Sequence, residues 1–238
     1  MQDVLRQIDE VSSPGELWRV ILSCYRAHGF NALAYFIPRL SGGGNIGLVD
    51  VVYHGFPVEV VEAYLNQADG RNDPVPRFAM QQGVPMRWSH IWSMVEPDIE
   101  QMQFLERMRS VGLGDGYALP VFGPAQRNGN VNIGCAVSEE VMANAPLSEL
   151  HMIAQAAHIR LCKLMPDIQG PDKPLSAREL EILDWVARGK SNGVIAEILE
   201  LSSGTVDTYL RRIYEKLDVS DRTSAAVRGV GMGLITVD

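Results

Sequence analysis

The sequence predicts an α+β protein with two domains joined by a linker. Residues 1–164 alternate helical patterns with strand-like runs, which is typical of an α/β/α sandwich around an antiparallel sheet. Residues 165–174 contain three prolines and one glycine without periodicity, so we interpret them as the linker. Residues 175–238 carry helical periodicity alone, and this predicts an all-α domain of four helices.

The N-terminal domain is expected to begin with helices and to build its sheet from two pairs of strands. Ser13 and Pro14 are typical of a helix start, because serine caps free N–H groups and proline fits the first turn. Arg127-Asn128-Gly129 is a strong hairpin signal between two apolar runs, and Ser41–Asn45 is expected to be a flexible turn. The expected helices cover residues 1–11, 13–29, 58–67, 98–109 and 147–164, and the expected strands cover 33–38, 47–53, 116–122 and 130–137.

The helix expected over 147–164 carries a regular apolar seam. Its residues recur at alternating steps of four and three, the spacing at which helices pack together: Leu150, Ala154, Ala157, Leu161 and Leu164. Two interpretations stay open at this point. The seam packs against the sheet of its own domain, or it forms the interface of a homodimer.

The C-terminal domain contains clear helix boundaries. Ser176 and Glu179 form a capping box ahead of an apolar run that ends at Gly189. A second short helix is expected around Ile195, a third after Ser202, and a fourth from Asp221 onwards.

The third of these helices has one apolar and one polar face. Val206, Leu210, Ile213 and Leu217 form a narrow buried stripe. At roughly 100° per residue the opposite face holds polar positions: Gly204, Asp207, Thr208, Arg211, Arg212 and Glu215. Two short helices, a turn and such a third helix are typical of a helix-turn-helix, whose third helix fits the major groove of DNA. The alternative is an ordinary helical domain with a solvated charged face.

On the first interpretation, the contacts with DNA divide into two groups. Arg211 and Arg212 are expected to reach bases or phosphates, and residues at helix ends are expected to hold the sugar–phosphate backbone. The segment is not basic overall, so only a local basic face is available. The expected DNA-binding residues are Lys190, Ser191, Ser203, Thr205, Asp207, Thr208, Arg211, Arg212, Lys216 and Arg222.

Composition excludes several classes of protein. The net charge of −8 argues against a general polyanion binder, and no apolar run approaches the ~20 residues of a membrane span. The three cysteines lack metal-ligand spacing, and no export signal is seen, so we expect reduced thiols and a cytoplasmic location. We find no Gly-x-Ser-x-Gly elbow, no paired histidines for a metal and no phosphate-binding glycine loop. We therefore expect no catalytic residues, no metal and no cofactor.

Several stretches of the C-terminal domain resemble the LuxR-type DNA-binding domain. They are Leu175-Ser-Ala-Arg-Glu-Leu-Glu-Ile-Leu, Trp185-Val-Ala-Arg-Gly-Lys-Ser, Ile195-Ala, Thr205-Val206, Lys216-Leu217 and the tail from Asp221 to Ile235. The resemblance implies a homodimer that binds double-stranded DNA, with RNA polymerase as a further partner. It also implies base reading by Asp207 and Arg211, since arginine pairs with guanine and a carboxylate accepts from cytosine. The alternative for Asp207 is that it only repels phosphate and so excludes wrong sites.

Residues 53–92 place aromatic side chains on both sides of an aspartate. The set consists of Tyr53, Phe56, Tyr64, Asp73, Trp88 and Trp92. Aromatic rings can enclose an apolar ligand while the carboxylate accepts a hydrogen bond from a ligand amide. The alternative is simple core packing of the rings, with Asp73 as a turn or helix cap.

The same segment resembles the autoinducer-binding domain of the quorum-sensing LuxR group, which binds N-acyl homoserine lactones between its sheet and a helical layer. Tyr64, Asp73, Pro74, Trp88 and Gly116 fall at the spacing of that family. The resemblance implies that Asp73 takes the ligand amide N–H, while Tyr64 contacts the acyl amide region. It further implies that Trp88 forms a wall for the lactone, and that Gly116 allows close packing beneath the site. The expected ligand-binding residues are Phe56, Val60, Tyr64, Asp73, Trp88, Gly116 and Cys135.

Two of these positions depart from the family pattern. Val60 stands where the family usually has a tryptophan whose indole holds the lactone carbonyl, and Phe56 stands where a tyrosine hydroxyl often meets the acyl carbonyl. Each lost hydrogen bond costs on the order of 0.5–1.5 kcal/mol. Our hypothesis is a quorum-sensing regulator whose small-molecule signal is an unusual acyl homoserine lactone or an analogue. The alternative is a solo regulator that responds to a non-lactone signal or works without a ligand.

Overall fold

The computed structural model describes residues 1–38, 49–65, 73–124, 127–165 and 174–236. The chain divides into two compact units, with the main division after Met165. The turn expected at 41–45 and most of the linker expected at 165–174 lie outside the described residues. Among the described residues, no helix combines the length and apolar character needed to cross a membrane.

The N-terminal unit is built on an antiparallel sheet of order β2-β1-β5-β4-β3. The strands are β1 Phe30–Pro38, β2 Val49–His54, β3 Met86–Arg87, β4 Gly116–Val121 and β5 Gly129–Ala136. The hairpin predicted around Asn128 is confirmed, because β4 and β5 pair with Val121 opposite Gly129.

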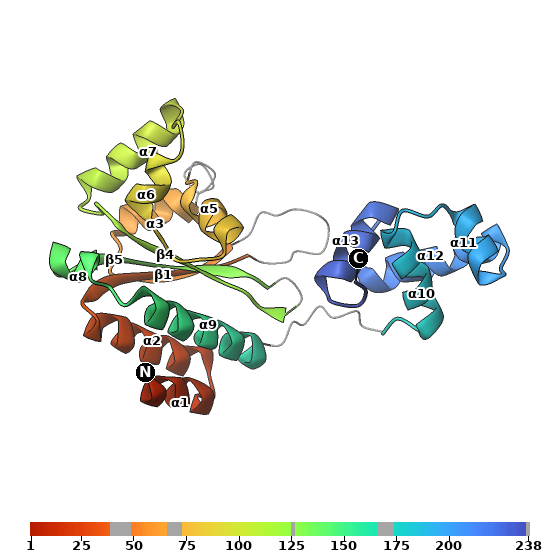
Figure 1. Cartoon of the computed structure of the whole chain (residues 1–238), viewed down its shortest axis with the longest axis horizontal. Coiled ribbons are helices and arrows are strands. Elements are labelled where there is room, and N and C mark those ends of the chain that lie inside the picture. Colours follow the sequence, from red (N-terminus) through yellow and green to blue (C-terminus); the bar gives the residue numbers. More distant parts are fainter. Residues whose placement is uncertain (39–48, 66–72, 125–126, 166–173, 237–238) are drawn as a thin grey trace. The chain divides into compact units, whose positions relative to one another are not determined.

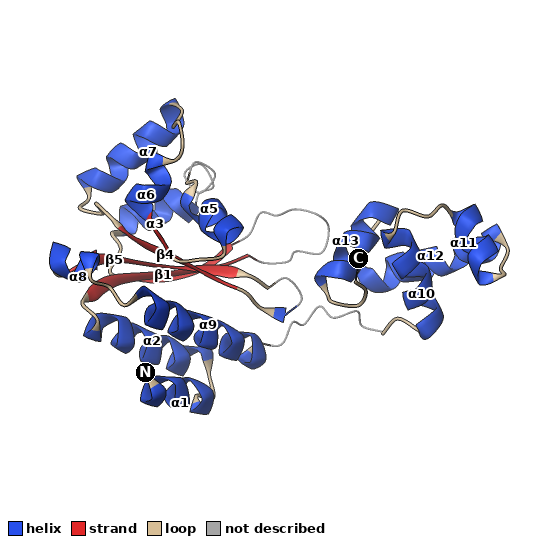
Figure 2. Cartoon of the chain, viewed as in Figure 1, coloured by secondary structure: helices blue, strands red, loops and turns tan. Residues whose placement is uncertain are grey.

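Helices cover the two faces of this sheet as separate layers, as Figures 1 and 2 show. One layer contains α1 Gln2–Glu10, α2 Pro14–Ala27 and α9 Leu147–Leu164. The other contains α3 Val58–Leu65, α5 Val75–Gln82, α6 Trp88–Ser93 and α7 Ile99–Ser110. A short helix, α8 Glu139–Ala143, follows β5. The predicted α+β class with an α/β/α sandwich is confirmed.

Strand alternation decides what each face of the sheet presents. Tyr35, Leu119, Val131 and Ile133 lie in the large core that the sheet shares with α1, α2 and α9. Residues one step away on the same strands point to the other layer, where Ala118 packs in a smaller cluster with residues of α5 and α6. The second face therefore carries fewer large side chains and leaves more room between the sheet and its helices.

The apolar seam of α9 belongs to the larger core. Leu150, Ala154, Ala157 and Leu161 are all buried in it, and Leu164 packs against it half-buried. The first interpretation of the seam is therefore correct, and a homodimer interface on these residues is wrong because they already contact the sheet of their own domain.

The C-terminal unit consists, where described, of α10 Ala177–Ala187, α11 Asn192–Leu199, α12 Ser203–Leu217 and α13 Arg222–Gly231. The residue before each helix caps it with its side chain: Ser176, Ser191, Ser202 and Asp221. The predicted capping box is confirmed, because the Ser176 side chain accepts from the Glu179 backbone N–H and the Glu179 side chain accepts from the Ser176 backbone N–H. The predicted stripe of α12 is buried at Val206, Leu210, Ile213 and Leu217. Because these four side chains are buried in the core of the domain, the opposite face of α12 is exposed to solvent.

Candidate functional site

The N-terminal unit contains a cavity of about 440 Å³ between its sheet and the layer of α3, α5, α6 and α7. Rings from several elements surround it: Phe36 and Tyr64 lie 4.9 Å apart between centroids, and Trp92 and Phe104 lie 6.2 Å apart. The lining residues are Ala34, Phe36, Tyr53, Phe56, Val61, Tyr64, Asp73, Val75, Trp88, Ser89, Trp92, Ser93, Pro97, Phe104, Leu105, Met108, Arg109, Leu113, Gly114 and Asn132. A cavity of this size and character suits a small, largely apolar ligand.

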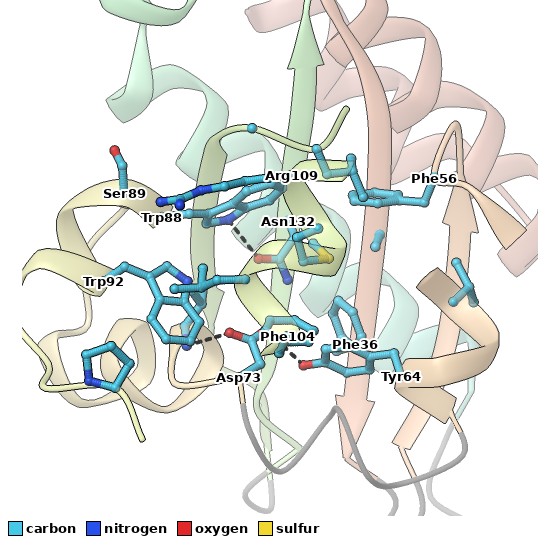
Figure 3. Close-up of a pocket in the computed structure, with 18 of the residues that line it drawn as sticks. Phe36, Phe56, Tyr64, Asp73, Trp88, Ser89, Trp92, Phe104, Arg109 and Asn132 are labelled. Carbon is cyan, nitrogen blue, oxygen red and sulfur yellow. Dashed lines mark hydrogen bonds between the residues drawn. The ribbon is translucent and has the colours of Figure 1, made fainter. Parts of the chain in front are cut away.

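Asp73 places a carboxylate among these rings (Figure 3). Its Oδ2 accepts a hydrogen bond from the Tyr64 hydroxyl at 3.2 Å, and its Oδ1 accepts one from the Val75 backbone N–H at 2.9 Å. Burial raises the pKa of Asp73 to about 6, although the bonds from Val75 and Tyr64 act in the opposite direction. A carboxyl held in this way is a strong acceptor for a donor group on a buried ligand.

Trp88 lies along the sheet on the opposite side of the cavity from Asp73 in Figure 3. Its indole Nε1–H donates to Oδ1 of Asn132 at 3.2 Å, and both side chains are buried. Because the Asn132 oxygen accepts this bond, the Asn132 NH2 group is the part of the side chain that can donate to a ligand. The Trp88 N–H already donates to Asn132, so Trp88 offers a ligand its ring and not its N–H group.

In the C-terminal unit, α12 presents Thr208, Arg211 and Arg212 to solvent. The Thr208 hydroxyl bonds back to the Gly204 carbonyl at 2.9 Å, and the Arg212 guanidinium lies 5.8 Å from the centre of the Tyr209 ring. Thr205 bonds to the helix cap at Ser202. The exposed face of α12 therefore offers two guanidinium groups, whose forked donors suit guanine edges and phosphates.

Asn192, the first residue of α11, forms hydrogen bonds with side chains of α12 and α13. Its Nδ2 donates to Asp207 on α12, and its Oδ1 accepts from Arg222 on α13 at 2.8 Å. Arg222 also donates to the Lys190 carbonyl. These bonds fix the Asp207 carboxylate on the outer face of α12 and hold the start of α11 beside it.

Comparisons with known proteins found a matching family profile for each of the two units. The family profile described as "Autoinducer binding domain" matches residues 13–161, and the one described as "Bacterial regulatory proteins, luxR family" matches residues 173–228. The chain belongs to the LuxR family of bacterial transcriptional regulators. Members of this family bind DNA and regulate transcription in quorum sensing, and they are regulators rather than enzymes.

Named relatives span most of this LuxR-family chain. RhlR of Pseudomonas aeruginosa, a quorum-sensing regulator, is 31% identical over 76% of this chain and 75% of its own length. The transcriptional activator AnoR of Acinetobacter nosocomialis is 26% identical over 98% of both chains. The crystal structure of Escherichia coli SdiA has a TM-score of 0.74 with 20% identity, covering 99% of this chain and 98% of SdiA. The SdiA likeness shows that the LuxR-type fold is shared.

The structure brings together most of the ligand-binding residues predicted for this LuxR-type domain. Phe56, Tyr64, Asp73 and Trp88 line the cavity. Val60 lies in α3, and its side chain is outside the described residues.

Cys135 does not line the cavity, which corrects the expectation that it contacts ligand. Along β5 it alternates with Asn132 and Gly134 and so belongs to the other face of the strand. It also has a left-handed backbone with φ of 50°, and its half-buried thiol has a raised pKa because of burial.

Gly116 lies behind Trp88 rather than in the cavity wall. A Cβ at this position would lie 2.3 Å from the Ile133 carbonyl oxygen and 2.6 Å from the Trp88 ring.

We expect Gly116→Ala to push the Trp88 ring away from Asn132 and to lower the free energy of unfolding by about 1–3 kcal/mol. Chemical denaturation would measure this loss. A variant as stable as the wild type, with unchanged Trp fluorescence, would contradict the proposed packing.

Lys216 has a different role from the one the sequence suggested. Its ammonium donates to Oε2 of the buried Glu179 at 2.6 Å and to the Pro174 carbonyl at 3.1 Å. Burial pushes the pKa of Glu179 upward, but hydrogen bonds from Lys216 and Ser176 outweigh it and leave the pKa lowered. Lys216 therefore pairs a buried charge within the domain, and we do not assign it to DNA.

Sequence reasoning missed several residues of both sites. Asn132, Phe104 and Arg109 line the cavity, and Asn192 braces the helix-turn-helix. A signal for Asn132 was present, since a strand that reads Gly129-Asn-Val-Asn-Ile places two amides on one face of a buried sheet. The contributions of α7 and of Asn192 depend on contacts between separate elements, which a local pattern does not contain.

Proposed function

We propose that this regulator binds an N-acyl homoserine lactone, or an analogue with an acyl amide, in the cavity of its N-terminal domain. The observation that carries the proposal is the half-buried Asp73 carboxylate, held by Tyr64 and Val75 among aromatic rings. A ligand amide N–H satisfies this carboxylate, and the rings enclose the acyl chain. The cavity of about 440 Å³ lies within the range of roughly 300–1,000 Å³ that small-molecule sites occupy.

We propose further that the protein acts on DNA as a homodimer through α12. Two copies present two α12 helices to successive major grooves about one helical turn apart. Arg211 and Arg212 contact bases or phosphates, and Asp207 accepts a hydrogen bond from cytosine. The remaining residues hold the sugar–phosphate backbone from α12 itself or from the starts of α11 and α13: Lys190, Ser191, Ser203, Thr205, Thr208 and Arg222. Control of a promoter then follows from contact with RNA polymerase, or from its obstruction, at the bound site.

Ligand and DNA binding are linked by stability in this proposal. A ligand that binds the folded domain and not the unfolded chain stabilises it by mass action. The test is a thermal-shift and calorimetric titration of the full chain with N-acyl homoserine lactones of varied acyl group. Saturable binding with a rise in Tm supports the proposal, and the absence of binding by every lactone overturns it.

A non-lactone acyl compound is the second candidate, and two observations favour it. Val60 and Phe56 supply no hydrogen-bond donor where the family usually has one. In addition, a structure of SdiA that shares this fold at a TM-score of 0.73 contains octanoyl-rac-glycerol. Octanoyl glycerol is therefore included beside the lactones. Tight binding of ordinary lactones that survives Val60→Trp unchanged would show that the pocket is not altered.

A further inference from the structure

Asn130 is a buried polar side chain that the described residues do not satisfy. It is 3% exposed, and neither its Nδ2 nor its Oδ1 has a hydrogen-bond partner in the part of the chain that the structure describes. Buried side-chain amides in folded proteins are nearly always paired, because an unpaired one has lost its bonds to water without replacement. An exception of this kind calls for an explanation, and a partner from outside the chain is one.

The register of the sheet places Asn130 at the edge of the ligand cavity, one row beyond Asn132, which lines it. Asn130 lies opposite Phe36 on β1, and Asn132 lies opposite Ala34. Phe36, Ala34 and Asn132 all line the cavity. Asn130 therefore projects from the same face of β5 as Asn132, in the next row along the strand, about 7 Å further on.

The two asparagines differ in what the protein supplies to them. Asn132 is held by the Trp88 indole N–H, which fixes the orientation of its carboxamide. Asn130 receives no such bond from any side chain or backbone group of the described ranges. An apolar acyl chain lying over this row would cover the Asn130 amide and leave it unpaired. A polar group on the ligand would pair it.

We propose that Asn130 recognises a hydrogen-bonding group near the far end of the ligand, such as a hydroxyl or a carbonyl. The ligand class is then an acyl amide whose tail carries an oxygen, rather than a plain alkyl chain. This inference rests on the proposed function of the same cavity. The amide end is held at Asp73, the acyl chain passes Asn132 and Phe36, and the oxygen at its end bonds with Asn130.

The test compares matched pairs of N-acyl homoserine lactones, with and without a terminal hydroxyl, at acyl lengths of six, eight and ten carbons. Calorimetry measures their affinities for the full-length wild type and for Asn130→Leu. We expect the wild type to bind one hydroxylated member at least ten-fold more tightly than its plain counterpart. We expect Asn130→Leu to lose or reverse that preference, because leucine covers an alkyl tail without leaving an unpaired amide.

Two further measurements make the result decisive. The ligand-free Asn130→Leu protein should have a higher Tm than the wild type, since the unpaired amide is gone. Asn31→Leu is the matched control, because Asn31 is exposed on the neighbouring strand β1, and it should keep the wild-type preference. Should the leucine variant fail to fold, Asn130→Ala is measured in the same way.

The outcomes separate this inference from the proposed function. Equal affinity of the wild type for both members of every pair overturns the role of Asn130 alone, as does a preference that Asn130→Leu retains. Failure of every lactone to bind the wild type overturns both proposals. A preference that disappears in Asn130→Leu and persists in Asn31→Leu supports the role of Asn130.

Discussion

Replacing Arg211 and Arg212 together by alanine is expected to abolish specific DNA binding while leaving the N-terminal cavity unchanged. Both side chains lie on the exposed face of α12, opposite the buried stripe that includes Leu210 and Ile213. A bidentate contact between arginine and guanine contributes about 1–3 kcal/mol of discrimination, which is about 5- to 150-fold in affinity. The loss of two such groups is therefore expected to lower specific affinity by about 10²–10⁴-fold. Fluorescence anisotropy with a duplex selected from genomic fragments would measure it.

Salt dependence separates the roles of the two arginines when Arg211→Ala and Arg212→Ala are also measured singly. A residue that neutralises a phosphate changes the slope of log affinity against log salt by about 0.9, whereas a residue that reads a base changes discrimination between sequences. Arg228→Ala is the control for each single substitution, since Arg228 lies on α13 outside the α11–α12 pair and its replacement also removes one positive charge. Unchanged affinity and an unchanged salt slope in the double variant would contradict the role of α12.

Local signals allowed most of the fold to be predicted. Ser13 and Ser176 are followed by helices because their side chains cap the N–H three residues on, as the structure shows. The helix over 147–164 was predicted with both ends correct, since its apolar spacing persists for five turns. Such features depend on neighbours in sequence and are therefore readable without a structure.

Short elements escaped prediction for the opposite reason. The helix α5 Val75–Gln82 and the helix α6 Trp88–Ser93 are too brief to show a clear period, and β3 Met86–Arg87 is two residues long. They form because Ala79, Ile91 and Met86 pack in the small cluster with Ala118 of β4. Tertiary contacts supply the stability that a one- or two-turn helix lacks alone.

The candidate site was predictable where a family resemblance supplied the spacing and not where geometry alone decides. Asp73 and Trp88 line the cavity as the resemblance implied. Cys135 and Lys216 differ from expectation for physical reasons. Cys135 belongs to the other face of β5, and Lys216 pairs with Glu179, which is 37 positions away in the sequence. The bond of Trp88 to Asn132 joins β5 to the start of α6, and no local pattern indicates it.

Asp73→Asn is expected to weaken ligand binding and, above pH 6, to stabilise the ligand-free protein. Hydrogen bonds to a charged group contribute about 1.5–3 kcal/mol, so loss of the carboxylate should lower affinity for an acyl amide by about 10- to 150-fold. Asparagine still accepts from the Val75 N–H through its carbonyl oxygen, and its NH2 can donate to the Tyr64 hydroxyl. The local fold should therefore persist while the acceptor for the ligand amide is lost.

The pH dependence follows from the raised pKa of Asp73. With a folded pKa of about 6 and an ordinary pKa of 3.8, the folded state holds this proton over a range in which the unfolded state has released it. The contribution of protonated Asp73 to the free energy of unfolding is fully present below about pH 4, and it is lost as the pH rises to about 6. The loss is on the order of 3 kcal/mol, because each tenfold change in proton affinity corresponds to about 1.4 kcal/mol. Asp73→Asn does not titrate, so its unfolding free energy should lack this decline and exceed that of the wild type at pH 8.

Ligand affinity should change with pH in the opposite direction. Ionised Asp73 is the better acceptor, so the wild type should bind an acyl amide more tightly as the pH rises from 5 to 7, and Asp73→Asn should not. Asp98→Asn is the control, because it removes the same charge from the same domain at the exposed cap of α7, where asparagine caps equally well. If Asp73→Asn bound ligand as tightly as the wild type, or kept the same rise with pH, the ligand would have to be held without this carboxylate.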